Sequence, residues 1–369
     1  MKSTSGLYGR LLILGLLSSL ALPTKAAGPA KIATIDRSTW PKAINSSSAF
    51  DQASAAEIRR FASVIANQSL DNIEQIQTLT GITKVDTHSV HRWIAKTKIH
   101  LLENYRKACP QCQVQGWQDL VRDSQTFEQT SKFSDWRLAS LAFYQRYFYE
   151  QVRLAALFPR ISSEIERFDS QSEQDGFDFS DKQFLLTYDD GPSTDKVVAH
   201  QTHNLTRDLI TKLNDNNIHA LFFVLGESLD HSSVKLDEYS QQCIGSHGQQ
   251  HKSHQNWQFW QQSLDQMRSK LASQNMRWFR PPYGQRTPEL IANLKQHNER
   301  VMLWNIDSQD WNKKLSNQQV HDRVTTLMLL WRKGIILYHD IHPRAVDNLP
   351  LFIELRNTHQ IELLDCHSL

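Results

Sequence analysis

Cysteine is scarce in this chain of 369 residues, which contains only four. Four cysteines are too few to build a disulfide scaffold of this size. Cys109 and Cys112 have the spacing of a redox pair or of half a zinc site, but no second Cys-x-x-Cys accompanies them. We therefore expect a local structural disulfide between them. For Cys243 and Cys366, the sequence leaves both the free and the paired state open.

Long apolar runs are also scarce. The run at residues 11–22 is preceded by Lys2 and Arg10 and followed by small residues at 24–26. It is shorter than the roughly 20 residues that a transmembrane helix needs. We expect residues 1–26 to be a signal peptide, so that the chain is exported to the periplasm or secreted, without stable membrane insertion after cleavage. An uncleaved membrane anchor is the alternative.

A strong net charge is missing as well. The formal charge is +2, and loss of residues 1–26, which carry three basic and no acidic groups, would bring it to −1. A nearly neutral chain has no bulk electrostatic attraction for nucleic acid or for an anionic membrane. We expect neither as a partner.

Apolar residues recur with helical spacing through residues 50–165. One stripe begins at Ile58 and a second at Val90. A third segment, 136–158, is crowded with aromatic residues, which is more typical of the core of a helix bundle than of a sugar-stacking surface. The sequence predicts a mainly α-helical domain over residues 27–168, with an unknown role and an unknown protein partner.

The pattern changes after a polar segment at residues 169–181, which we interpret as a linker. Short apolar runs then alternate with stretches of helical length, which is typical of a parallel α/β architecture. We expect residues 182–369 to form a distorted, incomplete (β/α) barrel of about seven parallel strands, with an open doubly wound sheet as the alternative. The expected strands are 184–188, 219–224, 243–246, 277–280, 300–306, 334–339 and 360–365. The expected helices are 197–216, 256–274, 287–297, 316–332 and 346–357.

Ionisable residues follow these strands at their C-terminal ends. They are Asp189, Asp190, His247, His251, Arg280, Asp307, Asp310, His339 and Asp340. In an α/β barrel the C-terminal strand ends converge on one face, where active sites are built. The sequence therefore predicts one site that contains these side chains.

Two features within this set indicate metal chemistry only when they are taken together. Asp189 and Asp190 stand before a Gly-Pro turn, and such a sequence is also ordinary turn chemistry. His247 and His251 lie one helical turn apart, but in a chain with 16 histidines such a pair arises easily. Two histidines and one carboxylate would hold a divalent ion and leave coordination positions open for water and substrate.

Five motifs in a fixed order make the segment from about 181 to 369 resemble the polysaccharide deacetylases of the NodB-homology type, carbohydrate esterase family 4. The motifs are Thr187-Tyr-Asp-Asp-Gly-Pro-Ser193, His247-Gly-Gln-Gln-His251, Arg280-Pro-Pro-Tyr283, Asp307-Ser-Gln-Asp-Trp311 and Leu337-Tyr-His339. The resemblance covers a little over half of the chain. Tyr188 and Gly248 depart from the residues that are more usual in the family, but no catalytic position that we can match is missing.

The resemblance implies a metal site and a general base. Asp190, His247 and His251 would bind one divalent ion, with Zn²⁺ expected first and Co²⁺ or another divalent ion as the alternative. Asp189 would take a proton from the attacking water, and Arg280 would orient Asp189. The metal and Arg280 would also keep the second of two adjacent acids ionised.

The resemblance also implies groups that act on the substrate. His339 would protonate the leaving amine, with Asp310 holding and charging its imidazole. The backbone N–H of Tyr283 would stabilise the oxyanion. Trp311 and Leu337 would line a pocket for the acetyl methyl group.

The activity implied in this way is hydrolysis of a linear amide. The enzyme would remove N-acetyl groups from a polysaccharide that contains N-acetylglucosamine, such as a chitin-like polymer, poly-N-acetylglucosamine or a peptidoglycan glycan. One alternative is an esterase that removes O-acetyl groups from a polysaccharide such as acetylated xylan. The other is a non-catalytic glycan-binding or scaffold protein whose helical domain is the working part.

Overall fold

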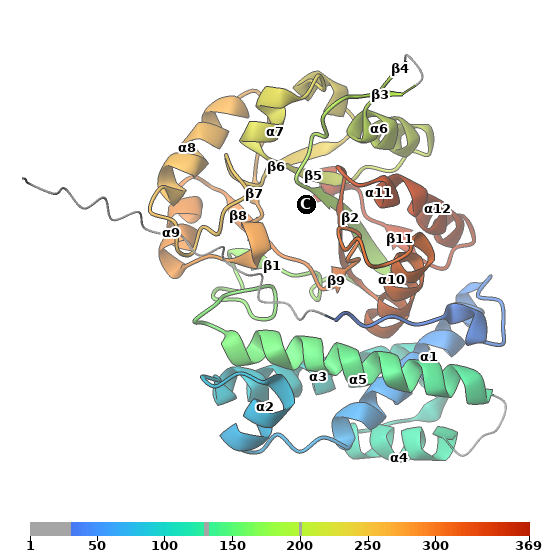
Figure 1. Ribbon diagram of the computed structural model, residues 1–369. Helices are drawn as coiled ribbons and strands as arrows, with labels where there is room; N and C mark the ends of the chain where they lie inside the picture. Colours follow the sequence, from blue (N-terminus) through green and yellow to red (C-terminus); the bar gives the residue numbers. More distant parts are fainter. Residues whose placement is uncertain (1–30, 129–132, 199–200) are drawn as a thin grey trace, which may run out of the picture.

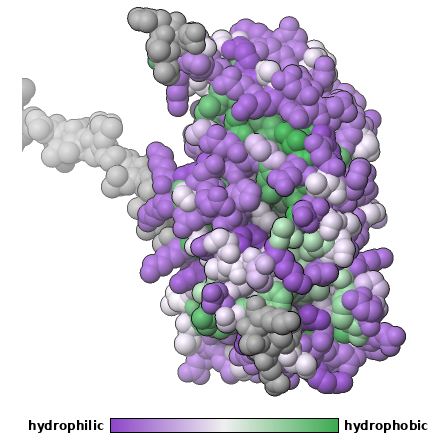
Figure 2. All heavy atoms as spheres, turned by 90° about the vertical axis from the view of Figure 1, so that its right-hand side faces the viewer, coloured by the Kyte–Doolittle hydropathy of each residue, from purple (hydrophilic) through white to green (hydrophobic). Residues whose placement is uncertain are grey.

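The computed structural model describes residues 31–128, 133–198 and 201–369, and it places a helical layer beside a curled parallel sheet (Figure 1). The predicted signal peptide lies outside these described residues. No helix in the described part of the chain is long and apolar enough to cross a membrane. The face seen in Figure 2 is mainly hydrophilic, with apolar residues confined to smaller areas.

The N-terminal part is helical, as the apolar stripes predict, and we call residues 31–168 the helical domain. Its helices are α1 (Ser47–Ala66), α2 (Ile73–Thr80), α3 (Thr87–Ala108), α4 (Trp117–Glu128) and α5 (Ser134–Leu157). Side chains of Ser46, Asn72 and Asp86 cap the first three helices by accepting backbone N–H groups. The aromatic crowding along α5 lies in the core, because Phe143, Tyr144, Tyr147 and Phe148 are all buried.

The C-terminal part is built on a parallel sheet with the order β1-β8-β7-β6-β5-β2-β10-β9, and β11 pairs with the start of β2. The sheet curls into an incomplete barrel with helices on its outside, as expected (Figure 1). The strands are β1 (Glu173–Gln174), β2 (Gln183–Asp189), β5 (Leu221–Val224), β6 (Cys243–Ser246), β7 (Trp278–Phe279), β8 (Arg300–Met302), β9 (Ile306–Asp307), β10 (Gly334–His339) and β11 (Glu362–Leu363).

The single strand expected at 300–306 is wrong, because this stretch forms two strands in different places in the sheet. β8 pairs with β1 and β7, whereas β9 pairs with β10. The link between them reaches both edges of the sheet: Leu303 N donates to Gln174 O over 2.7 Å, and Asn305 N donates to Ile335 O over 3.4 Å. The apolar run therefore spans the gap in the barrel instead of continuing one strand.

The helices around the sheet agree with the alternating pattern, but those expected at 197–216 and 256–274 are clearly shorter in the structure. The expected helix at 197–216 is α6 (Leu205–Asp215), which begins after Asn204 because the Asn204 side chain accepts the N–H of Arg207. A hairpin of β3 (Lys196–Val198) and β4 (Gln201–His203) precedes it. The other helices are α7 (Gly226–His231), α8 (Trp260–Lys270), α9 (Pro288–Gln296), α10 (Asn317–Trp331), α11 (Pro343–Asp347) and α12 (Leu349–Asn357).

The polar segment at 169–181 differs from the expected linker because it is packed into the sheet. It contains β1, which pairs with β8. Glu173 is fully buried, forms an ion pair with the equally buried Arg286, and accepts the backbone N–H of Asp169 over 2.9 Å. Part of its polar composition thus serves a buried contact with the barrel.

Both cysteine pairs are closed. Cys109–Cys112 is the local disulfide that the spacing favours. Cys243–Cys366, which the sequence leaves open, links the first residue of β6 to the C-terminal segment across 123 positions. This second bridge secures the chain end against the barrel.

Loss of the long-range disulfide should destabilise the protein more than loss of the local one. In the loop-entropy account, a closed loop of more than 100 residues restricts the unfolded chain strongly, and typical bridges contribute about 2–4 kcal/mol. We expect the double variant Cys243→Ala/Cys366→Ala to lower the free energy of unfolding by about that amount in urea titrations. Cys109→Ala/Cys112→Ala is the matched control, and an equal loss in both variants would contradict this account.

Candidate active site and metal centre

The C-terminal ends of the strands line one cavity of about 350 Å³. Eight of the ten residues expected at the site contribute to its wall: Asp189, Asp190, His247, His251, Tyr283, Trp311, Leu337 and His339. The other two, Arg280 and Asp310, are buried behind the wall and contact Asp189 and His339 respectively. The strand-end pattern therefore brings these side chains to one place.

Three of these residues offer ligand atoms that lie within 4.8 Å of one another, namely Asp190, His247 and His251. Asp190 Oδ1 lies 3.3 Å from His247 Nε2 and 3.5 Å from His251 Nε2. Burial alone would raise the pKa of Asp190, but His247 and the nearby histidine charges hold that pKa well below its usual range. Asp190 Oδ1 is buried and has no hydrogen-bond partner among the described residues.

The ring of His247 is oriented by the backbone. Its Nδ1 lies 2.7 Å from the carbonyl oxygen of Arg280, which can only accept a hydrogen bond, so Nδ1 carries the proton. Its Nε2 atom then faces Asp190. Histidines that bind a metal through one ring nitrogen are commonly oriented by a hydrogen bond from the other ring nitrogen.

His251 completes this set from the loop after β6. Its ring lies edge-on to the ring of Tyr283, with centroids 4.5 Å apart. Burial lowers the pKa of His251, which favours the neutral imidazole that binds metals. The donor set of one carboxylate and two imidazoles fits a divalent ion with open coordination positions.

Asp189 is held by a buried guanidinium. Arg280 Nη1 donates to Asp189 Oδ1 and to Thr187 Oγ1, each over 2.8 Å. The Nε and Nη2 atoms of Arg280 donate to the carbonyl oxygens of Met302 and Leu303, each over 3.1 Å. These four contacts fix the guanidinium, so it presents a fixed positive charge to Asp189 but not to Asp190.

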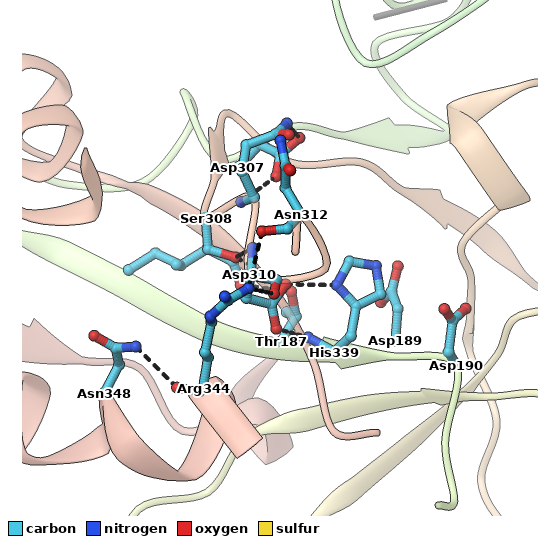
Figure 3. A network of polar contacts seen from close by, with 12 residues as sticks. Thr187, Asp189, Asp190, Asp307, Ser308, Asp310, Asn312, His339, Arg344 and Asn348 are labelled. Carbon is cyan, nitrogen blue, oxygen red and sulfur yellow. Dashed lines mark hydrogen bonds and ion pairs between the residues drawn. The ribbon is translucent and has the colours of Figure 1, made fainter. Parts of the chain in front are cut away.

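His339, at the end of β10, is clamped by Asp310 (Figure 3). Its Nδ1 lies 2.7 Å from Asp310 Oδ1, and its backbone N–H donates to Asp310 Oδ2 over 2.9 Å. Burial alone would lower the pKa of His339, but the Asp310 carboxylate outweighs this and raises it to about 10. The imidazole is therefore protonated at neutral pH, and its Nε2 side is left for a ligand.

The remaining expected residues also lie at the cavity. Tyr283 has a positive φ of 60°, and its backbone N–H makes no hydrogen bond within the described part of the chain. Leu337 is buried at 4% exposure, whereas Trp311 is 45% exposed. An unpaired N–H, an apolar floor and an exposed aromatic ring thus border the same space.

Sequence reasoning missed the part of the wall that comes from the helical domain. Its members are Ile32, Glu150, Gln151, Leu154, Ser163 and Glu164. Glu150 is held by Arg323 of α10 at 2.9 Å. The helical periodicity gave no signal for these residues, because contact with the barrel depends on packing between distant segments.

Asp340, the last of the strand-end acids, lies outside the cavity wall. Its Oδ2 accepts a hydrogen bond from Thr206 Oγ1 over 2.7 Å. Its carboxylate also packs so closely on Gly191 that a Cβ added there would lie 1.9 Å from an oxygen. Asp340 therefore packs against the turn that follows Asp190, on the side away from the cavity.

Comparison with known proteins matches residues 177–302 to the family model described as polysaccharide deacetylase. The Bacillus subtilis protein YheN, which carries the name of a polysaccharide deacetylase, is 28% identical over 190 residues, covering 47% of this chain and 63% of its own length. Chitin deacetylase 1 of Saccharomyces cerevisiae is 27% identical over 227 residues, covering 56% of this chain and 69% of its own length. The match thus spans less than two thirds of the Bacillus relative.

Among solved structures, the Bc1960 peptidoglycan N-acetylglucosamine deacetylase aligns with a TM-score of 0.45 and 20% identity. The alignment covers 53% of this chain and 92% of that chain.

The raised pKa of His339 should depend on Asp310. In Asp310→Asn the opposing carboxylate is lost and burial remains, so we expect the pKa of His339 to fall from about 10 to its ordinary value or below. Titration of the imidazole signals by NMR in the metal-free protein measures this change. Asp208→Asn, an exposed change on α6, is the control.

The same shift makes a prediction for stability. A histidine whose pKa is higher in the folded than in the unfolded protein stabilises the fold. This stabilisation is complete at pH values below the pKa of the unfolded state, and it is lost as the pH rises through the pKa of the folded state. The wild-type protein should therefore lose stability from this group between about pH 6.5 and about pH 10, and Asp310→Asn should not. A pKa of His339 that is unchanged in the variant would contradict this assignment.

Proposed function

The C-terminal domain of this chain belongs to the polysaccharide deacetylases of the NodB-homology type, and from this premise we propose that the protein is a metal-dependent hydrolase that removes N-acetyl groups from a polysaccharide containing N-acetylglucosamine. The observation that carries the proposal is the different pairing of two adjacent acids. Asp189 pairs with a guanidinium, and Asp190 faces two imidazoles. These different partners suit Asp189 to the role of general base and Asp190 to the role of metal ligand.

The chain's own residues fit a divalent ion. Asp190, His247 and His251 would hold it, since Asp190 Oδ1 is otherwise a buried acceptor without a donor. We propose Zn²⁺, because a small set of imidazole and carboxylate ligands with open positions suits this ion. When bound, the ion would polarise the acetyl carbonyl and lower the pKa of a water molecule at the site.

Asp189 would act as the general base. Its Oδ1 is bound to Arg280, and its Oδ2 lies 3.8 Å from His247 Nε2, on the side of the proposed ion. The buried guanidinium of Arg280 gives Asp189 a fixed counter-charge beside the second carboxylate. A water molecule attacking the acetyl carbon would pass its proton to Asp189.

The other half of the reaction needs an oxyanion donor and an acid. The unpaired N–H of Tyr283 is available to the oxygen of the tetrahedral intermediate. As the C–N bond breaks, the protonated His339 would give its proton to the leaving nitrogen, and Asp310 would hold the ring in place. The products are acetate and a free amine. Leu337 and Trp311 would surround the methyl group in the cavity.

Export to the periplasm or the cell exterior belongs to this proposal. A polysaccharide substrate lies outside the cytoplasm, and the N-terminal sequence has the order of a signal peptide. Both disulfides are also typical of an oxidising compartment.

Acetate release tests the proposed reaction. The full chain with Zn²⁺ bound should release acetate from N-acetylglucosamine oligosaccharides, poly-N-acetylglucosamine or peptidoglycan glycan. A chelator should abolish the release, and Zn²⁺ or Co²⁺ should restore it. Release from acetylated xylan alone would favour the esterase. No release from any glycan, with glycan binding retained and no metal found by elemental analysis, would favour a binding protein.

Two neighbouring substitutions should separate the metal ligand from the base. Asp190→Asn should lose both the bound metal and the activity. Asp189→Asn should keep the metal by elemental analysis and lower kcat by about 10²–10⁴-fold, the usual contribution of a general base. Thermal unfolding checks that each variant is folded, since Arg280 loses its charge partner in the second. An Asp189→Asn enzyme with normal kcat would exclude Asp189 as the base.

A further inference from the structure

The end of the helical domain is fixed to the loop that carries Tyr283. We call residues 162–166 the docking segment. The fully buried Arg286 donates through Nη1 to the carbonyl oxygen of Ser163 over 2.9 Å and through Nη2 to that of Glu166 over 2.8 Å. Ser162 Oγ donates to the carbonyl oxygen of Arg286 and accepts its N–H, over 2.8 and 2.7 Å.

Close backbone packing makes this arrangement specific. Gly284, next to Tyr283 in the chain, has a φ of +67° and lies against the docking segment. A Cβ at Gly284 would come within 3.0 Å of the backbone nitrogen of Glu164. The position of Glu164 is therefore set by the same loop that presents the Tyr283 N–H to the cavity.

Glu164 brings an unpartnered acid into the cavity wall. It lines the same cavity as the proposed metal ligands, and within the described ranges no other side chain is hydrogen-bonded to its carboxylate. Burial, with repulsion from Asp307, raises the pKa of Glu164 to about 7 despite a hydrogen bond from its own backbone N–H. A partly buried acid without a side-chain partner gains stability from a ligand that donates a hydrogen bond.

The side of the cavity next to the helical domain is acidic. It carries the carboxyl groups of Glu150, Glu164 and Asp307, against the single guanidinium of Arg323. Arg323 Nη2 donates a hydrogen bond to Glu150 over 2.9 Å, and Asp307 Oδ2 accepts one from the Gln309 amide over 2.6 Å. Glu164 is thus the acid on this side that is left for a ligand, and above about pH 7, where Glu164 is ionised, a carboxylate on the ligand would be repelled here.

We propose that the helical domain forms one wall of the substrate site, and that Glu164 binds the sugar through a hydroxyl or amino group and selects neutral or cationic amino-sugar chains over carboxylated ones. This inference rests on the proposed function and narrows its substrate class. Chains of N-acetylglucosamine, with or without free amines, satisfy the requirement. Glycans in which every second sugar carries a carboxylate do not.

Binding and turnover of matched oligosaccharides test the proposal. The neutral probe is a pentasaccharide of N-acetylglucosamine, and the anionic probe is a strand of similar length that alternates N-acetylglucosamine with N-acetylmuramic acid. In the full chain with Zn²⁺ bound, Glu164→Ala should raise KM for the neutral probe about tenfold and leave kcat within about twofold, because a hydrogen bond to a carboxylate is lost. Glu164→Gln should reduce the preference for the neutral over the anionic probe.

The matched control is Glu103→Gln, an exposed residue of α3 away from the cavity, which should change neither constant. Calorimetric titration of the neutral probe in the Asp189→Asn background gives a readout that does not require turnover. There Glu164→Ala should weaken binding by the same factor of about ten. Thermal unfolding of each variant excludes a general loss of structure.

The outcomes separate the two proposals. Acetate release by the wild-type protein with an unchanged KM and Kd in Glu164→Ala would overturn the role of Glu164 and leave the deacetylase function intact. A wild-type preference for the anionic probe would overturn the proposed selectivity. Absence of acetate release from both probes would reject the proposed function, while the titrations would still decide whether Glu164 binds the sugar.

Discussion

The buried ion pair between Arg280 and Asp189 is the contact on which the site depends. Arg280 joins the end of β2 to two carbonyl groups after β8, and its own carbonyl oxygen orients His247. The guanidinium is fully buried and lies 4.2 Å from the ring centroid of Phe223, inside the barrel. Removing one partner of such a pair typically costs about 3–5 kcal/mol, because the other charge stays buried without compensation. The residue that pairs with Asp189 therefore also contacts the ends of β2, β6 and β8 around the cavity.

The acids at the strand ends have different partners. Asp189 has a guanidinium, Asp310 has an imidazole, and Asp340 has a hydroxyl. Asp190 faces two imidazoles and keeps an oxygen without a hydrogen bond, although buried acceptors are nearly always paired. That difference is the physical reason why we propose Asp190 as the metal ligand and Asp189 as the base.

Features that depend on local pattern or on strand direction could be predicted from the sequence. Parallel strands bring their C-terminal ends together, so acids and histidines in that phase, from Asp189 to His339, reach one cavity. Features set by distant contacts could not be predicted. The division of 300–306 depends on pairing with β1 and β10, and the Cys243–Cys366 bridge joins positions 123 apart. The polar segment at 169–181 resembled a linker because the partner of Glu173, Arg286, is far away in the sequence.

The helical domain is part of the site architecture, because two buried arginines connect it and its exit segment to the strand-end face of the barrel. Arg286 holds the docking segment and Glu173 against the loop of Tyr283. Arg323 donates to Glu150 of α5, to the carbonyl oxygen of Ala33 and to that of Asp307 at the end of β9. A shift of the helical domain would therefore move the proposed oxyanion donor on one side of the cavity and the Asp307–Trp311 loop on the other. A polysaccharide at the proposed metal centre would therefore contact a cavity wall that the barrel shares with the helical domain.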